Sequence, residues 1–209
     1  MFCAEDGSGG NPLGVLVGGA AVPEAERQPI AHELGFSETV FVDDAARGAM
    51  RIFTPQSELP LAGHPLVGTA WVLRSHGVEV DTLRPPAGEV RVRFDGALTF
   101  AAARPEWSPP WELAELGSAA EVDGLTGPPE GMDLVSAWAW IDEGAGLVRA
   151  RVFAEEAGIV EDEATGSAAL MLTARLGRPI EIRQGRGSVI HARPLEDGFA
   201  EIGGRVARA

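Results

Sequence analysis

The chain has 209 residues, of which 45% are hydrophobic, and its 31 acidic residues against 17 Lys and Arg give a formal charge of −14. This composition predicts a globular protein of one large or two small domains, and the charge disfavours nucleic acid and anionic membrane surfaces as partners. The apolar runs are too short for a membrane span, the N-terminus is acidic where a signal peptide would be basic, and the single Cys3 permits no internal disulfide. We therefore expect a soluble cytoplasmic protein.

The first half of the chain predicts alternating strands and helices. Residues 15–17 are typical of a short strand, and residues 23–34 predict a helix with Glu24 and Glu26 in its first turn, Pro29 inside it and Gly35 at its end. Residues 40–42 and 50–53 predict a hairpin-like pair of strands. Residues 66–73 then predict a helix that is apolar on all sides and ends at Gly77, so other elements must surround it.

The second half repeats this arrangement. Residues 90–94 and 98–100 flank an Asp95-Gly96 turn, as in a hairpin, and residues 105–110 are the best linker candidate. A second all-round apolar helix is predicted over 167–174, with strands expected over 135–141, 147–153, 180–183, 189–193 and 199–202. We expect an α+β fold of two pseudo-symmetric lobes, residues 1–104 and 111–209, each a rolled, mostly antiparallel sheet around one central helix. The C-terminal strand is a candidate to complete the first lobe.

Two segments of the chain look like edited copies of each other. Arg51-Ile52-Phe53 corresponds to Arg151-Val152-Phe153, and Gly68-Thr69-Ala70 corresponds to Gly166-Ser167-Ala168. The offset is 100 at the phenylalanines (153 − 53) and 98 at the glycines (166 − 68), which places His64 opposite Asp162. A duplication with different ionisable groups at one position predicts a site between two similar lobes.

Seven motifs in order along nearly the whole chain resemble the PhzF family, named for the phenazine-biosynthesis isomerase, which shares the fold of diaminopimelate epimerase. Each motif alone is weak evidence for the family, but all seven in this order are specific to it. They are Gly9–Leu13, Ser37–Phe41, Arg51–Pro55, Leu59–Pro65, Arg151–Ala154, Gly158–Asp162 and Ala164–Ala168.

The resemblance implies a cofactor-independent isomerase in which one glutamate moves a proton on a small, cyclic or unsaturated carboxylic acid. The matching residue is Glu38, which without the resemblance would be interpreted as a solvated carboxylate. A carbon acid needs a stronger base than a free glutamate, so we expect a partly dry site, walled by Phe36, Val40 and Phe41, that raises the pKa of Glu38.

The resemblance further implies that His64 and Asp162 face each other across the cleft between lobes and assist the proton transfer. Unaided, His64 could instead tie a turn to a carbonyl, and Asp162 could be a helix cap or turn residue. The start of the second apolar helix, at Gly166 and Ser167, predicts a site for a substrate carboxylate, because free N–H groups and the helix dipole attract anions. Gly63 is expected to line the opposite lobe, and Asn11 the mouth of the pocket, whereas Gly68 is interpreted as a packing residue.

Departures from the pattern leave the substrate open. Glu163 stands where the family usually has proline, and a second charge there could raise the pKa of Asp162 or alter substrate choice. The loop at 184–188 is short, and the chain begins later than typical members. A non-catalytic ligand-binding or scaffold protein therefore remains the alternative to an isomerase, and weak amino-acid epimerisation a third hypothesis.

The sequence lacks the residues and motifs that other reaction types would need. The cysteine pair of diaminopimelate epimerase is absent, because Cys3 is the only cysteine in the sequence. The four histidines are not spaced as zinc ligands, and no dinucleotide or nucleophile-elbow motif is complete. We therefore expect neither metal nor cofactor, a small-molecule carboxylate as partner and, from the family, a homodimer.

Overall fold

A small sheet of four strands forms one end of the molecule in the computed structural model, which describes residues 1–155 and 159–208. Its order is β1 (Leu13–Val17), β2 (Glu38–Asp44), β3 (Ala49–Phe53) and β4 (Glu58–Leu59). Strands β1 and β2 are parallel because α1 (Glu24–Leu34) carries the chain back, whereas β2, β3 and β4 are antiparallel. Helix α1 ends, as predicted, at Gly35, whose φ of 65° is the left-handed conformation of a helix cap.

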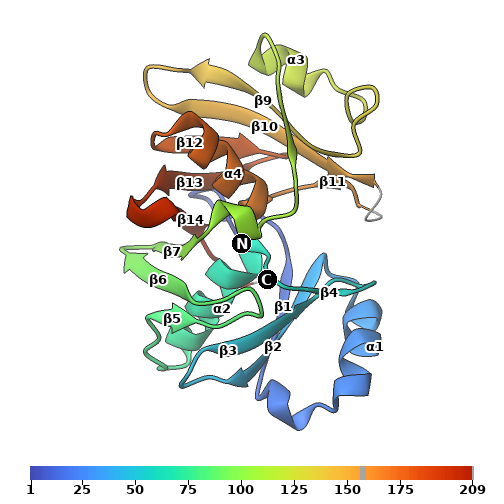
Figure 1. Cartoon of the computed structure of the whole chain (residues 1–209), viewed down its shortest axis with the longest axis vertical. Coiled ribbons are helices and arrows are strands. Elements are labelled where there is room, and N and C mark those ends of the chain that lie inside the picture. Colours follow the sequence, from blue (N-terminus) through green and yellow to red (C-terminus); the bar gives the residue numbers. More distant parts are fainter. Residues whose placement is uncertain (156–158, 209) are drawn as a thin grey trace.

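A large sheet runs through the rest of the molecule (Figure 1). Its strands are ordered β5-β6-β7-β14-β13-β12-β10-β9-β8, with β11 paired to β10. The predicted hairpin at Asp95-Gly96 is the β6–β7 turn, and the short α3 (Ala119–Asp123) lies near β9 and β10. The bounds are β5 (Thr82–Leu83), β6 (Val90–Asp95), β7 (Leu98–Ala103), β8 (Glu112–Glu115), β9 (Leu134–Asp142), β10 (Leu147–Ala154), β11 (Ile159–Asp162), β12 (Ile180–Gln184), β13 (Ser188–Pro194) and β14 (Ala200–Arg205).

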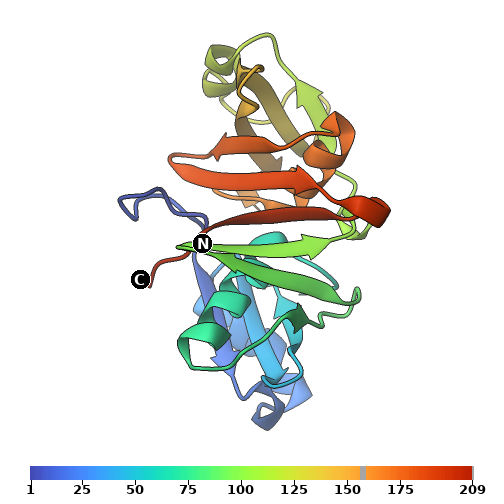
Figure 2. The ribbon, with the colours of Figure 1, turned by 90° about the vertical axis from the view of Figure 1, so that its left-hand side faces the viewer.

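The last strand joins the two halves of the chain. Strand β14 pairs antiparallel with β7 from Ala200 opposite Ala103 to Arg205 opposite Leu98, and its other edge pairs with β13. Figure 2 shows these strands crossing the middle of the molecule. The C-terminal strand therefore extends the β5–β7 part of the sheet, while the division into residues 1–104 and 111–209 stays a prediction.

Each half wraps one apolar helix, as the sequence predicts. Helix α2 (Gly63–Ser75) packs against the small sheet on one side and against β6 and β7 on the other, and most of its residues are buried. Helix α4 (Gly166–Leu176) packs against β13 and β14. Left-handed glycines follow both helices, Gly177 directly and Gly77 one residue later. The prediction of a central helix in each half is confirmed.

The duplicated Arg-x-Phe segments adopt the same local structure. On β3, Arg51 forms a two-point ion pair with Glu58 of the antiparallel neighbour β4, and its guanidinium lies 5.4 Å from the ring centre of Phe53. On β10, Arg151 pairs in the same way with Glu161 of β11 and lies 5.2 Å from the ring centre of Phe153. Each strand pair leads directly into its central helix, so the repeated unit is strand, strand, helix.

The described residues include no helix that is both long enough and apolar enough to cross a membrane. Gly158, the first residue of the Gly158–Asp162 motif, lies outside these residues.

Candidate active site

Three ionisable side chains meet where the two halves face each other. Glu38 begins β2, His64 is the second residue of α2, and Asp162 ends β11. The Nε2 atom of His64 lies 2.9 Å from Oε2 of Glu38, and both side chains are almost fully buried. The ring N–H is not aligned with the carboxylate as a hydrogen bond requires, and neither atom has another hydrogen-bond partner among the described residues. The pair is therefore close and buried, with polar atoms that no other described group satisfies.

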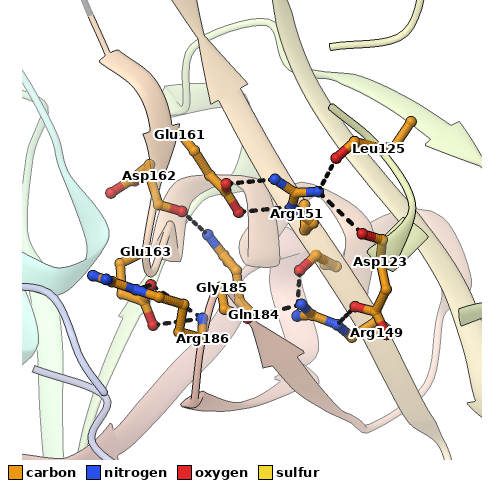
Figure 3. A network of polar contacts seen from close by, with 11 residues as sticks. Asp123, Leu125, Arg149, Arg151, Glu161, Asp162, Glu163, Gln184, Gly185 and Arg186 are labelled. Atoms are coloured by element: carbon orange, nitrogen blue, oxygen red, sulfur yellow. Dashed lines mark hydrogen bonds and ion pairs between the residues drawn. The ribbon is translucent and has the colours of Figure 1, made fainter. Parts of the chain in front are cut away.

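Asp162 is held from several sides. Its carboxylate accepts hydrogen bonds from Nδ2 of Asn11 at 2.6 Å and from the hydroxyl of Thr165 at 2.5 Å. Its main-chain oxygen accepts from Nε2 of Gln184 at 2.8 Å (Figure 3). Gln184 also donates to the Thr165 hydroxyl and accepts from the Thr165 amide. Thr165 and Gln184 were not anticipated from the sequence: Thr165 follows Asp162 by three residues, a spacing typical of turns, whereas nothing in the sequence points to Gln184.

Asn11 reaches Asp162 because of the turn before it. Gly10 has a φ of 85°, and a Cβ there would lie 2.7 Å from the main-chain oxygen of Met1, so only glycine fits. The Oδ1 atom of Asn11 accepts a hydrogen bond from Ser37, the residue before Glu38. The structure thus places Asn11 behind Asp162, and it is absent from the residues that line the described cavity. Asn11 therefore connects Asp162 with Ser37, the neighbour of Glu38.

The environments of the two carboxylates move their pKa values in opposite directions. Burial acts to raise the pKa of Glu38, but the charge of the nearby His64 outweighs burial and holds that pKa below its ordinary value. Burial, reinforced by the charge of Glu38, raises the pKa of Asp162 to about 6. The expectation that a dry site raises the pKa of Glu38 is therefore wrong for the ligand-free protein, because the sequence did not reveal how close His64 lies.

A cavity of about 320 Å³ opens beside these groups. Its lining includes the polar residues Glu38, His64, Asp162 and Thr165 together with apolar residues, which are Leu59, Leu61, Pro109, Trp111, Leu134 and Ile159. A hollow of similar volume on the large sheet contains Arg93, Arg193 and Glu201, but these side chains are already paired with one another. The cavity beside Glu38 is the better candidate because it combines a dry wall with unpaired polar atoms.

Two helix starts meet at this cavity. A Cβ on Gly63 would lie 2.4 Å from Cα of Gly166, so the first turns of α2 and α4 touch through their backbones. The residues that precede these helices, Ala62 and Thr165, provide no side-chain cap. Their first N–H groups are therefore available to an anion in the cavity. For a Cβ on Gly68, by contrast, the nearest atoms belong to the side chains of Leu13 and Met1, which fits its interpretation as a packing residue.

Glu163 points away from the catalytic candidates. Its carboxylate accepts a hydrogen bond from the main-chain N–H of Arg186 at 2.9 Å (Figure 3). It also accepts one from the hydroxyl of Ser188 at 3.0 Å. These hydrogen bonds hold the turn between β12 and β13 against Glu163. The expectation that Glu163 raises the pKa of Asp162 is wrong, because the raised value comes from burial and from Glu38.

Comparison with known proteins identifies the family. The family model described as phenazine biosynthesis-like protein matches residues 2–121. The trans-2,3-dihydro-3-hydroxyanthranilate isomerase of Pseudomonas fluorescens is 32% identical over 84% of this chain and 80% of its own length. The isomerase of the same name from Pseudomonas aeruginosa is 34% identical over 85% and 78%. The chain therefore belongs to the PhzF family and is an isomerase.

Solved structures share the fold. A phenazine biosynthesis PhzC/PhzF protein from Clostridium difficile superposes with a TM-score of 0.78 at 24% identity, covering 94% of this chain and 90% of its own. A hydroxyproline epimerase from Agrobacterium vitis superposes with a TM-score of 0.57 at 15% identity, over 89% and 78%. These similarities confirm the predicted α+β, diaminopimelate epimerase-like fold.

Proposed function

We propose that the chain moves a proton along the carbon skeleton of a small unsaturated or cyclic carboxylic acid, with Glu38 as the general acid and base. The observation that carries this proposal is the convergence of Glu38, His64 and Asp162 on one dry cavity between two uncapped helix starts. The cavity lining combines apolar side chains, which suit a hydrocarbon skeleton, with polar groups for the reacting and anionic parts of the ligand.

Glu38 is suited to start as the base. The lowered pKa keeps its carboxylate ionised in the free protein at neutral pH, so it can accept a proton from a substrate carbon. The electron pair left behind spreads into the neighbouring double bond and carboxylate, and Glu38 then returns its proton to another carbon. The double bond moves and no atom is gained or lost, so the reaction needs no co-reactant.

The substrate itself strengthens the base. A carboxylate bound at Gly166 and Ser167 brings a negative charge into the cavity, and a like charge in a dry site raises a carboxyl pKa. Asp162, with a pKa of about 6, holds a proton in part of the molecules near neutral pH, and together with His64 it is the candidate to assist reprotonation.

The test is solvent exchange. We expect that the protein, incubated in deuterium oxide with trans-2,3-dihydro-3-hydroxyanthranilate, the compound in its relatives' names, incorporates deuterium into carbon, followed by mass spectrometry. Glu38→Gln should slow this by about 10²- to 10⁴-fold, the usual contribution of a general acid-base group. Glu33→Gln, which alters an exposed glutamate on α1, is the matched control.

Binding without exchange in the unaltered protein would favour the non-catalytic alternative. Exchange that survives Glu38→Gln would remove Glu38 from the catalytic role. A homodimer and a cytoplasmic location stay predictions, of which light scattering tests the first.

A further inference from the structure

Trp111 forms a side-chain hydrogen bond with the start of α4. It precedes β8, and its ring packs with Val152, Ala154 and Ala168. Its indole Nε1 donates a hydrogen bond of 3.0 Å to the hydroxyl oxygen of Ser167. Both side chains are more than nine-tenths buried, and both line the cavity beside Glu38.

The direction of this bond orients the Ser167 hydroxyl and occupies one of its two acceptor lone pairs. An indole N–H donates and cannot accept, so the Ser167 oxygen must be the acceptor. The hydroxyl proton of Ser167 then needs an acceptor of its own, and Ser167 donates to no group in residues 1–155 and 159–208. A buried hydroxyl on the cavity wall is therefore left with its donor unused.

We propose that Trp111 is a positioning residue that holds Ser167 as a hydrogen-bond donor and so makes the site selective for a carboxylate. The inference rests on the proposed function, because it takes the ligand to lie at the start of α4. The free N–H groups of this helix also donate, so a carboxylate, which accepts at both oxygens, satisfies every group. A carboxamide in the same place turns its NH₂ group toward a donor. Trp111 occupies one of the two lone pairs of Ser167 and fixes the hydroxyl; without Trp111 the hydroxyl is free to rotate and both lone pairs are available to accept from that NH₂.

The experiment compares two ligands that differ only in this group. Affinities for cyclohex-1-ene-1-carboxylate and its carboxamide are measured by isothermal titration calorimetry. The proteins are the unaltered chain, Trp111→Phe, Ser167→Ala, the double variant and Trp140→Phe, a control in a tryptophan outside the cavity. Phenylalanine keeps an aromatic ring but removes the donor.

We expect the unaltered protein and Trp140→Phe to prefer the carboxylate. Ser167→Ala should lower that preference by about tenfold or more, the value of a hydrogen bond to a charged group. Trp111→Phe should lower it by roughly three- to tenfold, since the hydroxyl stays but loses its orientation. The double variant should lose no more than Ser167→Ala alone, because Trp111 acts through Ser167.

Other outcomes overturn the inference in distinguishable ways. If Trp111→Phe weakens both ligands equally, the indole only packs. If its effect adds fully to that of Ser167→Ala, it does not act through the serine. If the unaltered protein binds the carboxylate no better than the carboxamide, the carboxylate site of the proposed function falls as well, whereas deuterium exchange at Glu38 is judged separately.

Discussion

Replacing Gly63 with alanine tests the contact between the two helix starts most directly. The new Cβ would lie 2.4 Å from Cα and 2.6 Å from the carbonyl carbon of Gly166. Ordinary contacts to a Cβ begin near 3.4 Å, so α2 and α4 must separate by about 1 Å. The obstacle is backbone at the first turn of a buried helix, which cannot rotate away as a side chain can.

The expected loss is at or above the upper end of the range for overpacking, about 3 kcal/mol of unfolding free energy. Gly68→Ala is the matched control on the same helix. Its Cβ would meet Cδ2 of Leu13 at 2.6 Å and Sδ of Met1 at 2.7 Å, which are ends of flexible side chains. These side chains can move to relieve the contacts, and alanine is favoured over glycine inside a helix by about 1 kcal/mol. The Gly68→Ala variant should therefore stay within about 1 kcal/mol of the stability of the unaltered protein.

Urea unfolding followed by circular dichroism measures both variants, with the midpoint reporting stability at constant slope. Gly63 does not have a positive φ, so backbone strain does not contribute to its loss. Equal midpoints for the two variants would refute the reasoning, since they would mean that α2 and α4 separate at no cost. A destabilised Gly63→Ala should also bind cyclohex-1-ene-1-carboxylate more weakly, because the widened contact displaces the N–H groups at the cavity.

Two further predictions concern charges near the site. The pKa of Asp162 is raised from 3.8 to about 6, so the folded protein keeps a proton that the unfolded chain releases between these values. Relative to Asp162→Asn, the unaltered protein should therefore lose up to roughly 3 kcal/mol of stability as the pH rises from about 4 to 6. Urea unfolding of both proteins at a series of pH values measures this difference. A difference that stays constant with pH would contradict the prediction. Glu163→Ala should lose about 1–2 kcal/mol of stability, because the N–H of Arg186 and the hydroxyl of Ser188 lose their acceptor. It should leave the pKa of Asp162 in place, as measured by carboxyl carbon NMR, and a shift of that pKa would show that the two carboxylates interact.

Much of the fold could be predicted because its signals are local. The helices around Leu66 and Leu170 are apolar on every side, which demands burial, and left-handed glycines mark their ends. Both Arg-x-Phe segments lie in residue runs that predict strands, 50–53 and 147–153. Their partners Glu58 and Glu161 could not be aligned, because they follow their arginines by 7 and 10 residues.

The sequence predicted that three ionisable residues of the candidate site lie together, but it predicted neither their electrostatics nor the residues that support them. The motifs indicated Glu38, His64 and Asp162, which do meet. The direction of the Glu38 pKa depends on the position of His64 on another element, and the orientation of Glu163 depends on a turn more than twenty residues away. Gln184 gave no signal because a glutamine becomes a support for Asp162 only once β12 lies beside it.

The pairing of β14 with β7 also sets an order of events during synthesis. Strand β7 leaves the ribosome about a hundred residues before β14, so its hydrogen-bonding edge has no native partner while the second half is being made. An exposed edge of this kind can pair with other chains. The nascent polypeptide is therefore most exposed to aggregation in that interval, and removal of residues 200–205 would extend it indefinitely.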